Sequence, residues 1–131
     1  MPVTPTSHTS DSERHNALAR VMRLLPLLPL KSSFEVDYEA ADPDVLVEIA
    51  KQGELVLQHL AKGLSAVGSC LVYAANVAES EPDRIFVAEL GRLTAELSEL
   101  VSTLLPLVQA CRFHTVDYLA RKDELTKQAT F

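Results

Sequence analysis

Two long runs of the chain carry an apolar or small residue at alternating steps of three and four. In the first run these positions are Leu46, Ala50, Gly53, Leu57, Leu60, Leu64, Val67, Leu71, Ala74 and Ala78. In the second run they are Phe86, Leu90, Leu93, Leu97, Leu100, Leu104, Leu107, Cys111, His114 and Tyr118. This period puts the apolar residues on one face of a helix and is typical of helix packing against helix. The fold class is therefore predicted to be all-α.

The two runs are joined by the short segment Ser80-Glu81-Pro82-Asp83, in which Ser80 or Glu81 caps a helix and Pro82 opens it. So short a connection makes the two helices antiparallel neighbours, and residues whose numbers add to about 161 then lie at the same height. The apolar positions of the two runs match in that register. A long antiparallel helical hairpin is the predicted centre of the fold.

Further boundaries follow from capping and breaking residues. Ser10, Asp11 and Ser12 offer caps for a short N-terminal helix of about 12–25, which Pro26 and Pro29 end. Asp42-Pro43 begins the first long helix, and the two long helices are expected at about 43–79 and 82–122. We expect one helical domain over 11–125, a disordered tail at 1–10 and a frayed tail at 126–131.

An acidic segment at 33–41 separates the short helix from the hairpin. Apolar and acidic residues alternate within it, which is the period of a half-buried strand: Phe34, Glu35, Val36, Asp37, Tyr38 and Glu39. No second strand of comparable strength is present to pair with it. The segment therefore either lies on the helices of its own chain or seeks a strand edge on another molecule.

Apolar residues also exceed what one hairpin seam can bury. Val101, Leu105 and Val108 are expected beside the seam. The N-terminal helix and a second copy of the chain are the two candidates to cover them, which predicts a homodimeric helical bundle. The sequence leaves open whether the N-terminal helix packs on its own hairpin or on a neighbour's.

Few residues suggest chemistry. Cys111 and His114 share a helical face and are able to bind a metal together, but both fall on the apolar seam, which favours a core role. The hairpin register separates Cys70 from Cys111 by far more than a disulfide spans. We therefore predict no catalytic residue, no metal and no cofactor, and a protein that is not an enzyme. A small ligand beside the helix kink expected at Pro106 remains an alternative.

Glycine, charge and hydropathy limit the remaining classes. Gly53, Gly63 and Gly68 are expected at close helix contacts, because glycine destabilises a helix interior. The formal charge of −6 argues against direct nucleic-acid binding. The stretch Gly63–Ala78 has no charged residue, but as a helix it spans about 24 Å, short of a bilayer core of about 30 Å. We expect it to be buried in protein, and the chain to be cytoplasmic and not bound to a membrane.

From Asp42-Pro43-Asp44 through the two Leu- and Ala-rich helices, the chain resembles small bacterial helical-hairpin proteins of unknown function. The resemblance implies the helical fold and no particular activity.

The function predicted from the sequence is a non-enzymatic protein-interaction module that regulates or inhibits a protein partner. One alternative is an acidic inhibitor that imitates nucleic acid, as some phage proteins do. The other is a helical bundle that binds a small ligand or a metal. The predicted partner-binding residues are Phe34, Glu35, Val36, Asp37, Tyr38, Glu39, Val101, Leu105 and Val108.

Overall fold

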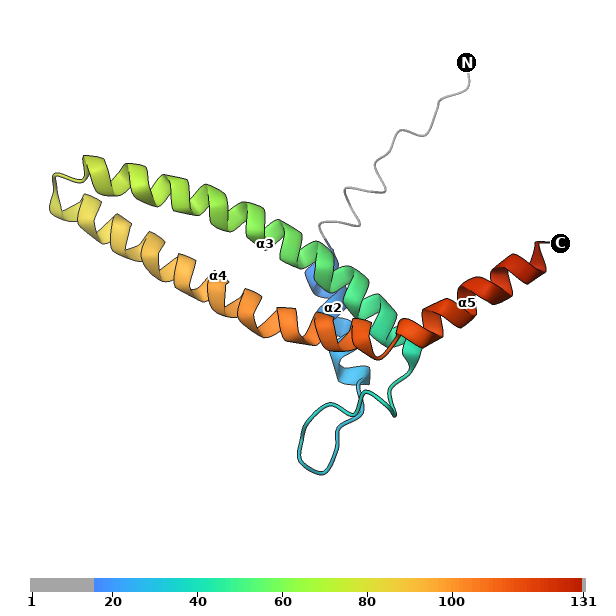
Figure 1. The fold of residues 1–131 in the computed structure, drawn as a ribbon. Coiled ribbons are helices and arrows are strands. Elements are labelled where there is room, and N and C mark those ends of the chain that lie inside the picture. Colours follow the sequence, from blue (N-terminus) through green and yellow to red (C-terminus); the bar gives the residue numbers. More distant parts are fainter. Residues whose placement is uncertain (1–15, 131) are drawn as a thin grey trace, which may run out of the picture. The chain divides into compact units, whose positions relative to one another are not determined.

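The structure is a computed structural model that describes residues 16–130 (Figure 1). Its elements are α2 (Ala17–Leu24), the 3-10 turn η1 (Leu25–Leu27), α3 (Pro43–Val77), α4 (Glu81–Phe113) and α5 (Val116–Ala129). No strand occurs over residues 16–130, and the predicted all-α class is confirmed. The predicted tail at 1–10, the start of the predicted helix at 12–25 and the last residue of the predicted tail at 126–131 lie outside the described residues.

Within the described range the chain forms two compact units. Unit 1 comprises residues 16–55 and 107–130, and unit 2 comprises residues 56–106. Unit 1 holds α2, η1, the first part of α3, the end of α4 and all of α5. Unit 2 holds the remainder of α3 and α4 with the turn between them.

The start of α3 agrees with the prediction. The Asp42 carboxylate accepts a hydrogen bond from the Asp44 amide at 2.9 Å, and the Asp42 carbonyl accepts one from Leu46 at 3.1 Å. Pro43 occupies the first helical position, where its missing N–H costs nothing. An acidic cap and a proline therefore define this boundary.

The start of α4 is capped reciprocally. The Ser80 hydroxyl accepts from the Asp83 amide, and the Asp83 carboxylate accepts from the amides of Glu79 and Ser80, each at 3.4 Å. The bond with the Ser80 side chain, followed by the two backbone bonds, lowers the pKa of the Asp83 carboxyl. The predicted turn is confirmed, with Glu81 as the first helical residue.

Unit 1 contains a small continuous core. Its buried members come from three segments: Leu28, Ala41, Leu46, Ile49, Ala50 and Cys111. Leu24, Leu25, Val36, Tyr38, Val45 and Leu107 pack around them. The N-terminal helix and the acidic segment thus lie on helices of their own chain, in the same unit.

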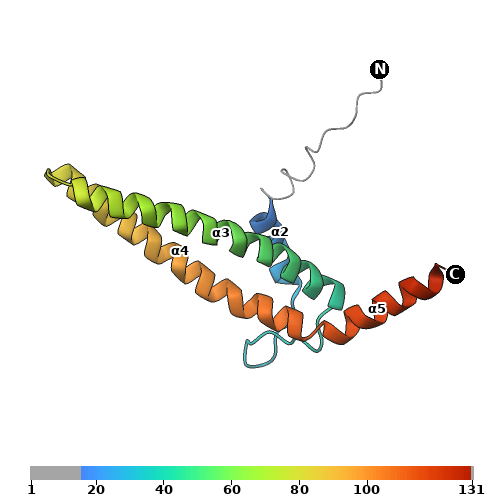
Figure 2. The same cartoon turned by 45° about the horizontal axis from the view of Figure 1, so that its top comes forward.

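Unit 2 is a hairpin of two helices, in which α3 and α4 run side by side (Figures 1 and 2). The predicted seam positions of α3 in this unit are all half-buried, from Leu57 to Ala78. On α4 the prediction was wrong at Phe86, Leu93 and Leu100, which are exposed. The less exposed positions of α4 are instead Val87, Leu90, Gly91, Thr94, Leu97, Val101 and Leu104.

The second long helix ends earlier than expected. α4 stops at Phe113, and α5 begins at Val116 and continues to Ala129, past the predicted end near 122. Thr115, which is fully buried, donates its hydroxyl to the Cys111 carbonyl at 2.7 Å, while its amide bonds to the Arg112 carbonyl. Because the Thr115 amide bonds three residues back rather than four, the backbone pattern of α4 is interrupted at this position. The Tyr118 hydroxyl then donates to the Asp44 carboxylate, which ties α5 to the start of α3.

Two of the three glycines expected at close helix contacts do not lie there. A Cβ added at Gly63 or Gly68 meets no atom beyond its own stretch of helix within 4 Å, and the same holds at Gly91. Only Gly53 is buried. The expectation that Gly63–Ala78 is buried in protein was likewise wrong within one chain, because no residue of this stretch is buried.

Candidate protein-binding surface

A hydrogen-bonded loop in unit 1 replaces the strand expected at 33–41. The Lys31 amide bonds to the Glu35 carbonyl at 2.8 Å, and the Asp37 amide bonds to the Pro29 carbonyl at 2.8 Å. Leu30 and Val36 form an isolated antiparallel bridge across the loop. These bonds pair part of the backbone of the segment within the chain. The sequence question of packing in cis or in trans is answered for Val36 and Tyr38, which contact the core of their own chain.

Phe34 lies at the tip of this loop and does not follow its neighbours into the core. Its side chain is 85% exposed, and its backbone has φ of 66°. The left-handed conformation costs a residue with a Cβ about 1–2 kcal/mol, and a bulky residue adopts it rarely. The Phe34 amide closes the turn by bonding to the Lys31 carbonyl at 2.9 Å.

Three aromatic rings from two parts of the sequence meet on unit 1. The rings of Tyr38 and His114 are stacked, with centroids 5.0 Å apart and an angle of 6° between their planes. Phe113 meets His114 edge to face at 5.2 Å, and its side chain is 76% exposed. We name these three residues, together with the exposed Phe34 at the loop tip of the same unit, the aromatic surface of unit 1.

The remaining predicted site residues are distributed unevenly. Glu35 and Glu39 are exposed, while the Asp37 carboxylate accepts from the Ala40 amide at 3.2 Å and so stabilises the turn. Among the apolar positions expected to be spare, Val108 is buried in unit 1 and Val101 is half-buried in unit 2. Leu105 alone of these three is exposed. The structure therefore does not unite the two predicted groups in a single site.

Arg112 and Glu54 form a two-pronged ion pair in unit 1. The Arg112 Nε donates to one Glu54 oxygen at 2.7 Å and Nη2 donates to the other at 2.8 Å. The hydrogen bond from Arg112 is the main reason that the pKa of the Glu54 carboxyl lies below its ordinary value. Because both side chains are more than a third exposed, solvent screens this pair.

We expect a double-mutant cycle of Glu54→Ala and Arg112→Ala to give a coupling energy of about 0.5–1 kcal/mol at pH 7. The folded state holds the Glu54 proton less tightly than the unfolded state, so the contribution is complete above the unfolded pKa. It is lost as the pH falls from the unfolded pKa of glutamate, about 4.3, through the lower, folded pKa. Urea unfolding at pH 7 and pH 3 measures both values. The exposed pair Glu89 and Arg92 is the matched control, with a coupling near zero.

The core role predicted for Cys111 and His114 is confirmed for Cys111 and is wrong for His114, which is exposed. The Cys111 thiol is fully buried, and burial raises its pKa to about 11, so it is neutral near pH 7. The His114 ring instead lies between Tyr38 and Phe113. Over residues 16–130 no group of three His, Cys, Asp or Glu side chains is placed to hold a metal.

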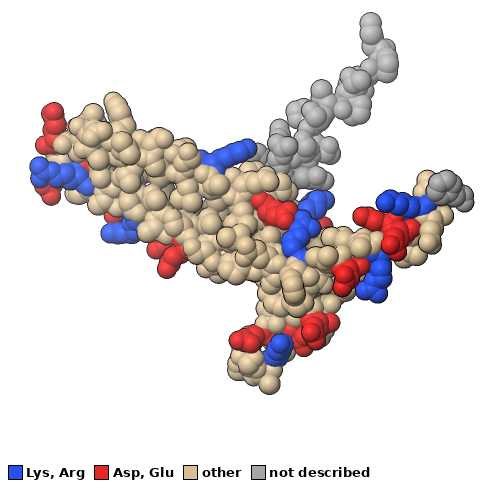
Figure 3. Space-filling model, in the orientation of Figure 1, with Lys and Arg blue, Asp and Glu red and all other residues tan. Residues whose placement is uncertain are grey.

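A second candidate surface lies in unit 2. Between Gly63 and Ala78 the outer side of α3 has no charged residue, whereas the exposed residues of α4 from Glu81 to Glu99 include both acids and bases. Figure 3 shows this uncharged part of α3 beside charged side chains at the end of the hairpin. By length and composition alone, α3 is long and apolar enough to cross a membrane. Of its most apolar stretch of 18 residues, 6% are buried.

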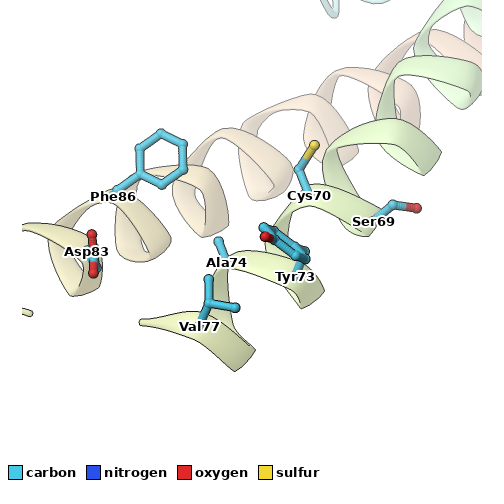
Figure 4. A pocket seen from close by; sticks show the side chains of 7 residues that line it. All are labelled: Ser69, Cys70, Tyr73, Ala74, Val77, Asp83 and Phe86. Carbon is cyan, nitrogen blue, oxygen red and sulfur yellow. The ribbon is translucent and has the colours of Figure 1, made fainter. Parts of the chain in front are cut away.

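An open pocket of about 550 Å³ lies between this part of α3 and the start of α4 (Figure 4). Tyr73, Cys70 and Val77 of α3 line it together with Phe86 of α4. Ser69, Ala74 and Asp83 complete the lining, so its polar groups are one hydroxyl, one carboxylate, the thiol and the phenol. Most of the lining is apolar, as in pockets that bind small ligands.

No family model, curated protein or solved structure matches the chain. The candidate surfaces therefore rest on the geometry of this molecule alone. Sequence reasoning missed Phe113 and the exposure of Tyr73 and Phe86. For Phe113 a signal was present, since it lies beside the predicted seam rather than on it. For Phe86 the apolar period pointed to the wrong face.

Proposed function

We propose that the chain is a non-enzymatic protein-interaction module that regulates a protein partner by binding it through the aromatic surface of unit 1. The observation that carries the proposal is the exposed Phe34 at positive φ. Its strain is not offset by packing, because 85% of the side chain faces solvent. Strained residues of this kind gather at binding sites, where a ligand supplies the missing contacts.

Other aromatic residues of unit 1 support the same function. Phe113 exposes a second large ring, and the stacked pair of Tyr38 and His114 holds that region on the core. Rigid aromatic side chains with few rotatable bonds are enriched among the residues that dominate protein interfaces. Glu35 and Glu39 flank the loop and favour a partner whose facing surface is basic.

The first test separates stability from binding. Phe34→Gly is expected to raise the free energy of unfolding by about 1 kcal/mol, because glycine adopts positive φ without strain. Urea unfolding followed by circular dichroism measures this change. Phe34→Ala removes the ring but keeps the Cβ and the strain, so it is the matched control and leaves the stability within about 0.5 kcal/mol. A loss of stability in Phe34→Gly contradicts the assignment of strain.

The second test addresses binding itself. A photoreactive phenylalanine analogue at position 34 is expected to give a discrete adduct with another protein in cells that make the chain. Excess wild-type protein competes with the adduct, and excess Phe34→Gly competes at least tenfold less well. The analogue at Glu124, an exposed position of α5, is the control. No adduct at position 34, or one that Phe34→Gly competes equally well, contradicts the proposed site.

A further inference from the structure

Unit 2 has almost no interior of its own. Among residues 56–106 only Val56 and Leu104 are buried. Large apolar side chains remain exposed at 37–71%: Val72, Tyr73, Val77, Ile85, Phe86, Leu93 and Leu100. Two helices of this length that bury so little need a further surface to pack against, since most helical stability in proteins comes from packing of an apolar face.

The exposed residues of α3 include a second periodic stripe, distinct from the seam with α4. It comprises Gly63, Ala66, Cys70, Tyr73 and Val77, spaced by alternating steps of three and four, and all five are exposed. We name these positions the outer stripe of α3. This spacing is the a/d repeat of helices that pack in bundles. The stripe carries no charge along its whole length.

Helix α4 has a matching stripe at Phe86, Leu93 and Leu100, each seven residues from the next and each exposed. The pocket shows that the two stripes lie on the same face of the hairpin. Phe86 and the α3 residues Cys70, Tyr73 and Val77 line one opening (Figure 4). The face is therefore broad, with one stripe from each helix.

We propose that a second copy of this chain packs on this face, so that two hairpins form an antiparallel four-helix bundle. A two-fold axis brings the same face of each copy together, and the outer stripe of α3, which has no charged residue, meets itself without like-charge repulsion. On α4 the exposed Glu89 and Glu96 fill the positions between Phe86, Leu93 and Leu100 at steps of three and four. The uncharged outer stripe of α3 is therefore the centre of the proposed contact, with Phe86 beside it.

The sizes of the side chains favour an antiparallel arrangement of the two copies. The bulky residues Tyr73 and Phe86 lie at the turn end of the face, and Gly63 and Ala66 lie at the other end. In an antiparallel pair centred near Cys70, the bulky end of one copy lies over the small end of the other. A parallel pair instead places Tyr73 against Tyr73 and leaves the glycine end without contacts. Large residues packed against small ones fill a bundle interior without voids.

The available area is sufficient for a stable dimer. The helical part of α3 in unit 2, residues 56–77, is about 33 Å long, and two adjacent helices are about 20 Å wide. Two such faces together bury on the order of 1,300 Å², within the range of about 1,200–2,000 Å² for stable interfaces. The proposed self-association uses unit 2, whereas the proposed partner site lies in unit 1. An experiment can therefore contradict one of the two proposals and leave the other standing.

Light scattering during size-exclusion chromatography tests the inference on the full chain. The expected mass is twice 14.4 kDa. Phe86→Glu is expected to raise the dissociation constant at least about a hundredfold and to give a monomer at micromolar concentration, because it places a charge in the apolar interface. Ile85→Glu is the matched control. Ile85 is 57% exposed and Phe86 59%, but Ile85 lies off the stripe, so that variant stays dimeric.

A crosslinking measurement on the wild-type chain tests the dimer even if the Phe86→Glu variant does not fold. A short bismaleimide is expected to join Cys70 of the two copies, while the buried Cys111 does not react. Cys70→Ser with Ser98→Cys moves the thiol off the face and abolishes the crosslink. A monomeric wild type, a dimer that Phe86→Glu leaves intact, or wild-type binding to lipid vesicles that Phe86→Glu removes would each overturn the proposal.

Discussion

Replacing Ile49 by alanine is expected to lower the free energy of unfolding by about 3–4 kcal/mol, the largest effect of any substitution considered for this chain. Ile49 is fully buried at the centre of the unit 1 core, which also contains Leu46, Ala50 and Cys111. The substitution removes three heavy atoms from a site whose neighbours come from separate segments. Such a site collapses poorly around the cavity, so the cost exceeds the transfer free energy of the lost atoms.

Urea unfolding monitored by far-ultraviolet circular dichroism measures this loss. Leu27→Ala is the matched control, because Leu27 is a large aliphatic residue of the same unit with 62% exposure. Its cost is expected to stay below about 0.5 kcal/mol. If Ile49→Ala costs no more than Leu27→Ala, the segments described as one core do not pack together in solution.

The parts of the fold that the sequence predicted well are those governed by local chemistry. Asp42-Pro43 specifies a helix start because a carboxylate and a proline satisfy the same unpaired backbone positions, whatever the surroundings. Ser80 and Asp83 act in the same way at α4. The period of α3 predicted its inward face, because small and polar residues clearly separate that face from the rest.

The face of α4 was harder to predict, for a physical reason. Leucines at 90, 93, 97, 100 and 104 form two adjacent stripes, and hydrophobicity alone does not distinguish the stripe that meets α3 from the stripe beside it. The face of α4 that meets α3 includes the polar Thr94. Its hydroxyl donates a hydrogen bond to the Leu90 carbonyl, so the side chain can lie in the seam without losing a hydrogen bond. The break before α5 also lacks a proline or glycine signal, and it occurs where the Thr115 amide bonds to the Arg112 carbonyl, three residues back.

The candidate site was predicted in composition but not in geometry. Strict alternation places Phe34, Val36 and Tyr38 on one face of an extended chain. A residue at positive φ reverses the course of the backbone, so Phe34 points to solvent while Val36 and Tyr38 pack on the core. Phe113 joins them only through tertiary contact with His114, which no local pattern encodes.

The second large effect concerns Gly68 and Gly91, and here stabilisation is expected. Changing both to alanine should raise the free energy of unfolding by about 2 kcal/mol, since each glycine in a helix interior costs about 1 kcal/mol relative to alanine. Both are half-buried, yet an added Cβ at either position has no atom beyond its own stretch of helix within 4 Å. Part of the gain arises in the unfolded chain, which loses conformational freedom with each substitution.

Urea unfolding of the two single variants and the double variant tests this, and the position of Gly63 supplies a contrast. Gly68 and Gly91 lie off the outer stripe of α3, so their substitution leaves dimer formation unchanged. Gly63 lies on that stripe with equally open space in one chain, and Gly63→Ala gains the same helical stability in a monomer. If a second copy packs closely at Gly63, the gain there is smaller or reversed. Equal gains in stability at all three glycines indicate that no second copy contacts the outer stripe of α3 at Gly63. A loss of stability at Gly68 and Gly91 contradicts the open space described around these two glycines.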